Sequence, residues 1–231
     1  MKTTKILTAL FLAASLPATA ALFSYTYDSG FVNGTSIPDG NANPWSDTRT
    51  VAVGESGLLI SEVRVRLNLS GGYNGDLYGY LSYNGVLVPL MNRVGVGSSD
   101  PFGYGDGGLN VTFQDGAANN IHFYQSVGGY SITGGASWQP DGRTVDPIAG
   151  VPADFDLPGT VTLGNFSAMD PNGDWTLVFA DVVGGGGSPT VASWGLDIEA
   201  VPEPVNVALG VFGAGALLAW AGSAWKKWRP A

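Results

Sequence analysis

The feature that most limits how this chain can fold is a set of short runs in which apolar and polar residues alternate. In residues 59–69, LISEVRVRLNL, every second residue from Val63 to Leu69 is apolar, and the residues between them are polar or charged. A repeat of two residues is the pattern of a half-buried β-strand, because successive side chains of a strand point to opposite faces. No stretch between residues 21 and 200 has a sustained helical repeat. The pattern therefore predicts an all-β fold.

Similar runs predict further strands, which Gly, Asn, Asp and Pro separate. We expect them over residues 77–83, 86–91, 109–113, 121–125, 161–166, 175–181 and 191–199. Tyr25 and Tyr27 indicate a first strand, although the segment 21–57 is otherwise poorly defined. Residues 92–108 and 128–158 have the composition of long loops. Many short strands and 35 glycines favour a turn-rich β-sandwich.

The first twenty residues have the composition of a secretory signal peptide. Lys2 and Lys5 precede an apolar stretch over residues 6–16, and Ala18-Thr19-Ala20 places small residues at the cleavage site. An apolar stretch of about 11 residues is too short to cross roughly 30 Å of hydrocarbon. We therefore predict an exported protein whose folded part begins near residue 21.

The part of the chain between residues 21 and 200 is strongly acidic. It contains five arginines, no lysine and 18 of the 19 Asp and Glu residues, which gives a formal charge of −13. Such a surface repels phosphate backbones, so we expect no nucleic-acid partner. It attracts cations, and Ca²⁺ prefers carboxylate and carbonyl oxygens. Solubility of an exported protein explains the same charge without any ligand.

Residues that could carry catalysis are scarce. The chain has no cysteine, which excludes thiol catalysis and thiolate metal sites. A serine triad needs a base. The single histidine, His122, lies between Ile121 and Phe123, and alternation would point these two inward and His122 to solvent. Neither a Gly-x-Ser-x-Gly elbow nor a phosphate-binding loop occurs. We expect a protein that is not an enzyme, with a hydrolase built on two carboxylates as the open alternative.

Several short motifs occur in a characteristic order. They are Gly75-Asp76-Leu77, then Gly173-Asp174-Trp175-Thr176-Leu177 with Asp181, then Trp194-Gly195-Leu196. In this order they resemble the P domain (P/Homo B domain) of proprotein convertases and secreted bacterial subtilisin-like proteases. The resemblance covers about residues 58–199. It implies a jelly-roll-like β-sandwich that accompanies a protease and has no catalytic residues of its own.

The same motifs predict part of the core. Two alternating sets of large apolar residues should point inward: Trp175, Leu177 and Phe179, and Trp194, Leu196 and Ile198. Two segments depart from the family. Residues 82–86, SYNGV, stand where the family has Ser-Pro-x-Gly-Thr, and Thr112-Phe113-Gln114-Asp115 stands where it has Thr-Phe-Asp-Asp.

Two groups of side chains are candidate ligands of calcium, the one cofactor that we consider. Asp76, Asp115 and Asp181 form the first group, because the resemblance places all three at strand edges. Asp170, Asn172 and Asp174 form the second, because their spacing is that of the start of an oxygen-ligand loop. The second group also has the sequence of a simple turn.

Polysaccharide is a further candidate partner of an acidic, exported sandwich. Stacking of sugar rings requires accessible aromatic side chains. The candidates in loop-like stretches are Trp45, Tyr104, Tyr130 and Trp138.

The end of the chain combines three parts. Pro202-Glu203-Pro204 comes first, 21 uncharged residues from Val205 to Trp225 follow, and Lys226, Lys227 and Arg229 come last. A helix of 21 residues is about 31 Å long, which matches the hydrocarbon core of a bilayer. The basic end would stay in the cytoplasm. We therefore predict one C-terminal transmembrane helix with the sandwich outside the cytoplasm.

These three parts, in this order at the C-terminus, resemble the PEP-CTERM sorting signal of Gram-negative bacteria. The resemblance implies that an exosortase recognises the tail, cleaves it near Pro-Glu-Pro and transfers the protein to the cell envelope or extracellular matrix. We thus expect a signal peptide (1–20), an N-terminal segment (21–57), a P-domain-like sandwich (58–200) and a sorting signal (201–231). The expected function is that of a non-catalytic exported binding module. The alternative is a secreted hydrolase, or the accessory domain of a separately encoded protease.

Overall fold

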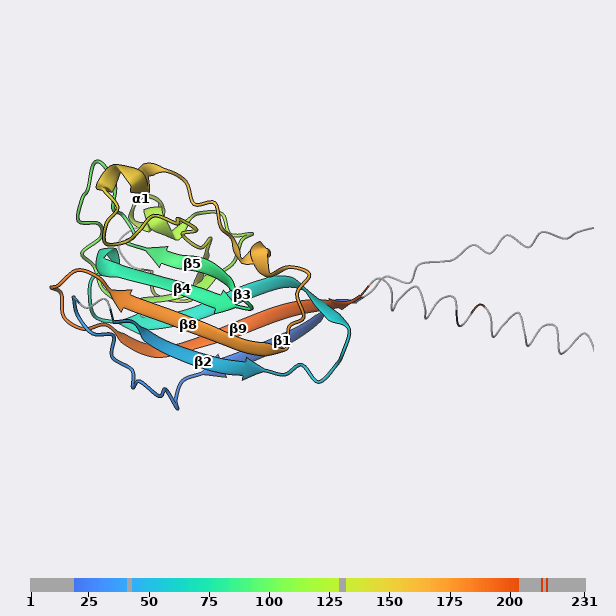
Figure 1. The fold of residues 1–231 in the computed structure, drawn as a ribbon. Coiled ribbons are helices and arrows are strands. Elements are labelled where there is room, and N and C mark those ends of the chain that lie inside the picture. Colours follow the sequence, from blue (N-terminus) through green and yellow to red (C-terminus); the bar gives the residue numbers. More distant parts are fainter. Residues whose placement is uncertain (1–18, 41–42, 129–131, 204–212, 214, 216–231) are drawn as a thin grey trace, which may run out of the picture. The chain divides into compact units, whose positions relative to one another are not determined.

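The computed structural model describes residues 19–40, 43–128 and 132–203, together with residues 213 and 215. Residues 20–201 form one compact unit. The strands of this unit build two sheets that face each other, so the predicted all-β sandwich is confirmed (Figure 1). The strand order is β1-β9-β3-β6-β7 in one sheet and β2-β8-β4-β5 in the other.

The five-stranded sheet contains β1 (Ala21–Tyr27), β9 (Thr190–Pro202), β3 (Leu58–Ser70), β6 (Leu109–Phe113) and β7 (Ala136–Trp138). The four-stranded sheet contains β2 (Trp45–Val51), β8 (Gly173–Asp181), β4 (Leu77–Tyr83) and β5 (Val86–Asn92). Short helices lie in the connections: η1 (Asn74–Asp76), η2 (Ile121–Phe123), α1 (Tyr124–Gly128), η3 (Pro152–Asp156) and η4 (Leu163–Phe166). β1 pairs antiparallel with β9, β3 with β6, and β8 with both β2 and β4, whereas β7 runs parallel to β6.

The core lies between the two sheets and is built by the predicted alternation. The apolar residues of β3 from Val63 to Leu69 are at most 3% exposed. The two inward sets on β8 and β9, from Trp175 to Phe179 and from Trp194 to Ile198, are at most 1% exposed. The Trp175 ring stacks on Tyr83 with 3.9 Å between centroids. Burial of one such side chain contributes about 2–3 kcal/mol, so these two strands supply much of the sandwich's stability.

β4 and β5 form a hairpin whose turn is Asn84-Gly85, as the sequence predicts. Both turn residues have positive φ, 47° at Asn84 and 80° at Gly85. This is the conformation of a type I′ turn, whose twist matches that of the two strands.

Two predicted strands are helices instead. Residues 121–125 form η2 and the start of α1, because the Asn120 side chain accepts a hydrogen bond from the His122 N–H and caps a tight turn. Residues 163–166 form η4, where the Asp115 carboxylate accepts the N–H groups of Leu163 and Gly164. A short apolar run is compatible with a strand or with a helical turn. In these two segments the side-chain caps, from flanking Asn120 and distant Asp115, favour the helical turn.

The sequence does not predict two of the observed strands, β2 and β7. β2 breaks the simple pattern because its inward position 47 is an aspartate, which is 4% exposed. Its carboxylate accepts hydrogen bonds from Trp194 Nε1 and Arg49 Nε, both at 2.7 Å. β7 is three residues long and lies inside the expected loop 128–158.

The predicted ends of the chain fall mostly outside the described residues. Among the residues that the structure does describe, no helix has the length and apolar character needed to cross a membrane. The predicted signal peptide, apart from residues 19 and 20, and the predicted span from Val205 to Trp225, apart from residues 213 and 215, lie outside them. Both therefore stay predictions.

Candidate functional site

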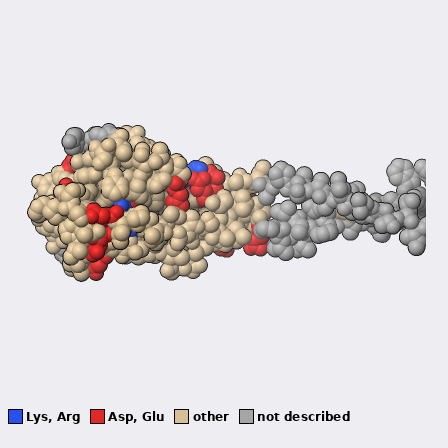
Figure 2. Space-filling model, turned by 90° about the horizontal axis from the view of Figure 1, so that it is seen from above, with Lys and Arg blue, Asp and Glu red and all other residues tan. Residues whose placement is uncertain are grey.

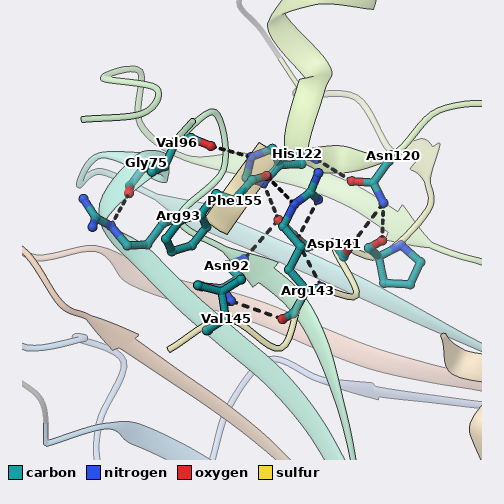
Figure 3. Close-up of polar contacts among 11 residues, drawn as sticks. Gly75, Asn92, Arg93, Val96, Asn120, His122, Asp141, Arg143, Val145 and Phe155 are labelled. Atoms are coloured by element: carbon teal, nitrogen blue, oxygen red, sulfur yellow. Dashed lines mark hydrogen bonds and ion pairs between the residues drawn. The ribbon is translucent and has the colours of Figure 1, made fainter. Parts of the chain in front are cut away.

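The single histidine belongs to a buried polar network. His122 is 0% exposed, whereas Phe123 beside it is 45% exposed, so the predicted outward histidine on a strand is wrong. The tight turn of η2 replaces the alternation of a strand and rotates the imidazole inward. Its Nδ1 lies 2.7 Å from Asp141 Oδ2, and its Nε2 lies 2.9 Å from the Val96 carbonyl oxygen (Figure 3).

The Asp141 carboxylate is the centre of this network and is itself 0% exposed. Oδ1 accepts hydrogen bonds from Arg143 Nη1 at 3.0 Å and from the Arg143 N–H at 3.3 Å. Oδ2 accepts from the Asn92 N–H at 3.3 Å, in addition to His122. Each oxygen therefore has two donors, as a buried carboxylate requires.

Arg143 and Asn92 extend the network to further segments. Arg143 Nε donates to the Phe155 carbonyl oxygen at 2.8 Å, and Asn92 Nδ2 donates to the carbonyl oxygens of Arg143 and Val145 (Figure 3). The network thus connects the end of β5 with η2, the loop after β7 and η3. Its members other than His122 lie in the two stretches, 92–108 and 128–158, that the sequence predicts as long loops, whereas His122 lies in a predicted strand.

The hydrogen-bond pattern determines what His122 can do. Both ring nitrogens of His122 have a partner within the protein, Nδ1 in Asp141 Oδ2 and Nε2 in the Val96 carbonyl oxygen. The residue is also 0% exposed, so neither nitrogen can reach a substrate. The geometry is that of a structural residue that fixes loops.

A cavity of about 220 Å³ adjoins this network, and its lining includes Asp115, Asn120, Gln139 and Asp141. The Asp115 oxygens accept from Leu163 N at 3.0 Å and Gly164 N at 2.6 Å. Asn120 Nδ2 donates to the Pro140 carbonyl oxygen. The polar groups on the cavity wall are therefore largely used to hold the loops that form it.

A second polar group contains two of the predicted calcium ligands. Asp76 and Asp181 lie side by side at one end of the four-stranded sheet, because Asp181 pairs with Leu77 and the Val182 N–H donates to the Asp76 carbonyl oxygen at 2.9 Å. Burial, together with the negative charges of Asp76 and Asp39, raises the pKa of the Asp181 carboxyl to about 6, against a lowering by the N–H groups of Val183 and Gly40. Burial and Asp39 also raise the pKa of Asp76, against a lowering by Arg93. We refer to Asp39, Asp76 and Asp181 as the Asp181 group.

Asp115, the third predicted ligand of this set, lies elsewhere. It follows β6 in the five-stranded sheet and caps η4. Within the described part of the chain, no three His, Cys, Asp or Glu side chains are grouped as a metal site. The structure therefore brings together Asp76 and Asp181 and adds Asp39, which the sequence did not single out.

The second predicted ligand set forms an internally bonded turn. Asp170 Oδ1 accepts the Asn172 N–H at 2.9 Å, and Asn172 Oδ1 accepts the Val53 N–H at 2.8 Å. Asp174 Oδ1 accepts the Thr50 hydroxyl at 2.6 Å. Each side chain has a partner within the protein, which favours the simple turn over a cation loop.

The predicted sugar-stacking residues are mostly part of the core. Trp45 and Trp138 are 2% and 7% exposed, so these two are not accessible to a ligand. Tyr104 is half-buried and packs edge-on against Tyr124 with 4.7 Å between centroids. Tyr130 lies outside the described residues.

The residues of the predicted sorting signal are described only at its start. Pro202 ends β9, and Glu203 follows it. Pro204, Val205, Trp225, Lys226, Lys227 and Arg229 lie outside the described residues.

No protein-family model matches this chain, and no curated protein does. The solved structures that are similar to it include two of a serine protease. One is the serine protease of Aeromonas sobria in complex with the chaperone ORF2, with a TM-score of 0.44, 15% identity, and coverage of 79% of this chain and 27% of that chain. The other is the serine protease of Aeromonas sobria, with a TM-score of 0.42, 15% identity, and coverage of 81% and 28%. The chain thus spans less than a third of the length of either protease chain.

Proposed function

We propose that this chain is a non-catalytic exported protein of the cell envelope or extracellular matrix of a Gram-negative bacterium. Its β-sandwich, which we propose to be P-domain-like and jelly-roll-like, serves as a binding module. Its C-terminal segment serves as a PEP-CTERM signal that an exosortase reads. Before processing, the segment from Val205 to Trp225 would anchor the protein in the inner membrane with the sandwich outside.

The observation that carries the non-catalytic part is the position of His122. It is the single histidine of the chain, it is fully buried, and both ring nitrogens are within hydrogen-bond distance of acceptors. A histidine-dependent hydrolase needs a base that reaches its substrate. The same residue in this protein fixes three loops and η3 through Asp141 and Arg143.

Export and sorting are supported by the sequence of the two ends. A basic start, an apolar stretch and Ala18-Thr19-Ala20 support secretion. Pro202-Glu203-Pro204, an uncharged span and a basic end support recognition by an exosortase.

Extracellular polysaccharide is the partner that we propose for the sandwich. Tyr78 and Tyr80 occupy alternate positions on β4, on the face opposite to the buried Leu77 and Leu81, with 5.6 Å between ring centroids. Neighbouring aromatic rings on an outer sheet face can stack on sugar rings. The excess of carboxylates over basic groups, visible in Figure 2, argues against nucleic acid and favours a neutral polysaccharide.

The test combines binding and turnover. The full-length chain, purified in mild detergent, is incubated with peptide substrates and with polysaccharide from the producing cell. We expect binding of the polysaccharide, no hydrolysis of either substrate, and weaker binding after Tyr80→Ala. Tyr73→Ala is the matched control, since Tyr73 is 44% exposed but lies outside the sheets.

Hydrolysis that is lost on substitution of Asp115 or another loop carboxylate, in a variant that keeps its fold, would favour the secreted hydrolase. Binding to a separately encoded protease, without binding to polysaccharide, would favour the accessory domain. Either outcome overturns the matrix-binding function.

A further inference from the structure

Asp181 lies in a position that a hydrophobic residue would normally occupy. It ends β8, and its alternation places it in register with Trp175, Leu177 and Phe179, which all point into the core. It pairs directly with Leu77 of β4, which is 0% exposed, and directly paired residues of antiparallel strands share a face. The carboxylate of Asp181 therefore points into the end of the sandwich, and the residue is 0% exposed.

One oxygen of this carboxylate has no hydrogen-bond partner. Oδ1 accepts the Val183 N–H at a long 3.4 Å, and the nearby Gly40 N–H lowers the pKa of the carboxyl, but Oδ2 is buried and forms no hydrogen bond among the described residues. A buried carboxylate oxygen without a donor is strongly unfavourable, and native proteins rarely leave one so. The Asp141 carboxylate, which has two donors on each oxygen, shows how this protein satisfies a buried charge elsewhere.

Further negative charge lies close to Asp181. Asp76 is 7% exposed and immediately precedes β4. Asp39 comes from the β1–β2 connection, where its Oδ1 accepts the Gly185 N–H at 2.9 Å. A Cβ at Gly40 would come within 2.7 Å of the Gly184 Cα atom, so the two loops are in close contact. Arg93 lowers the pKa of Asp76 but forms no ion pair with it among the described residues, so it offsets only part of the charge of the three carboxylates.

We infer that Asp181 and Asp76 bind a calcium ion at this end of the four-stranded sheet, and that Asp39 adds charge from the second coordination sphere. A divalent cation satisfies the unpartnered oxygen and removes the repulsion between the carboxylates. Calcium takes six to eight oxygens in flexible geometry, so two carboxylates can be completed by water and backbone carbonyl oxygens. An exported protein also meets calcium outside the cell, and to that extent the inference draws on the proposed export.

The experiment measures calcium-dependent stability and binding of the full-length chain in mild detergent. After removal of metals with a chelator, the protein is titrated with CaCl₂ by isothermal calorimetry and its thermal midpoint is recorded with and without calcium. We expect one calcium per chain. The midpoint should rise by roughly 5 °C or more when calcium is about 100 times its dissociation constant. MgCl₂ should have a much smaller effect, because magnesium demands regular octahedral geometry.

Three substitutions assign the site. Asp181→Asn and Asp76→Asn should each abolish the calcium response, and Asp39→Asn should weaken binding several-fold. Asp181→Asn replaces a carboxyl with an amide of the same shape, so it should fold in chelator at least as well as the unchanged chain. Asp174→Asn is the matched control, since Asp174 lies at the other end of the same strand, and it should leave the response unchanged.

A midpoint that does not respond to calcium, or a response that survives Asp181→Asn, would overturn the inference. In the first case Asp181 is held neutral by a proton instead of a cation. A response lost in Asp174→Asn and kept in Asp181→Asn would move the site to the turn over residues 170–174. None of these outcomes changes whether the protein binds polysaccharide or is sorted by its tail, so the two proposals fail separately.

Discussion

Two buried aspartates of this protein, Asp47 and Asp141, are each stabilised by several hydrogen bonds. Asp47 accepts from Trp194 and Arg49, and Asp141 accepts from His122, Arg143 and Asn92. Removal of one partner from such a group costs more than the pair contributes, because the remaining charge stays buried without a donor. Single substitutions therefore show which role each buried residue has.

His122→Ala should destabilise the protein strongly without affecting any chemistry. The change leaves Asp141 Oδ2 with one long hydrogen bond and the Val96 carbonyl oxygen without its partner. We expect the free energy of unfolding to fall by about 3–4 kcal/mol. Urea denaturation measures it, with Val127→Ala as the control, because Val127 is 51% exposed and nearby in α1. A loss below about 1 kcal/mol would mean that the network does not hold the loops.

The Asp156 carboxylate makes the stability of the folded state depend on pH. The hydroxyl and N–H of Ser98 donate to its carboxylate and lower its pKa. A group whose pKa is lower in the folded state stabilises the fold above its ordinary value, near 3.9, and loses this contribution as the pH falls through the folded value. Asp156→Ala should therefore lower the thermal midpoint slightly at pH 7 and by less at pH 2. An equal loss at both pH values would assign the effect to packing.

The strands differ in how well the sequence predicts them. β4 and β6 have the predicted bounds, and β3, β5, β8 and β9 differ by a few residues at most, because alternation and turn residues act locally. β2 was missed because a buried aspartate interrupts its pattern, and the reason for that burial, Trp194, lies in a distant strand. The alternation predicts strands where η2 and η4 lie, because the caps of these helices come from the Asn120 and Asp115 side chains, which no periodicity reveals.

The close packing of the two central strands of the four-stranded sheet depends on Gly79. A Cβ at this position of β4 would overlap the ring of Phe179 on β8, which is 0% exposed and cannot move away. Gly79→Ala should therefore lower the free energy of unfolding by about 3 kcal/mol. Thermal or urea unfolding measures the loss. Gly105→Ala is the control, since a Cβ there would meet nothing within 4 Å.

A second substitution distinguishes two causes for the destabilisation by Gly79→Ala, namely steric overlap with Phe179 and a change in strand propensity. In Gly79→Ala combined with Phe179→Leu, the smaller side chain leaves room for the added methyl group. The double variant should be more stable than the sum of the two single changes predicts. Simple additivity would contradict the steric explanation.

For the molecule as a whole, the sequence predicts the sandwich better than it predicts the sites. The core follows from alternation, which any sandwich must show. The His122 network was not foreseen, because its partners Asn92, Asp141 and Arg143 are up to 51 positions apart along the chain. The available signal was compositional: Arg143 is one of only five arginines between residues 21 and 200, and it lies two residues after an aspartate in a long loop. Asp76 and Asp181 were singled out by their motifs, whereas Asp39 joins them only through the close contact of two loops.

The fate of the C-terminal segment can be tested on the whole protein in its natural host. We expect a mature protein that lacks residues 1–20 and ends near Pro202-Glu203-Pro204. Replacement of these three residues by alanine should leave the chain uncleaved in the inner membrane, because the uncharged span and basic end would still anchor it. Intact-mass measurement and membrane fractionation report both effects. Alanine at Glu55 and Ser56, which are both exposed in the connection between β2 and β3, is the control and should leave processing unchanged. An unchanged C-terminus and location in the Pro202–Pro204 variant would show that these three residues do not direct processing, and the proposed sorting function would fail.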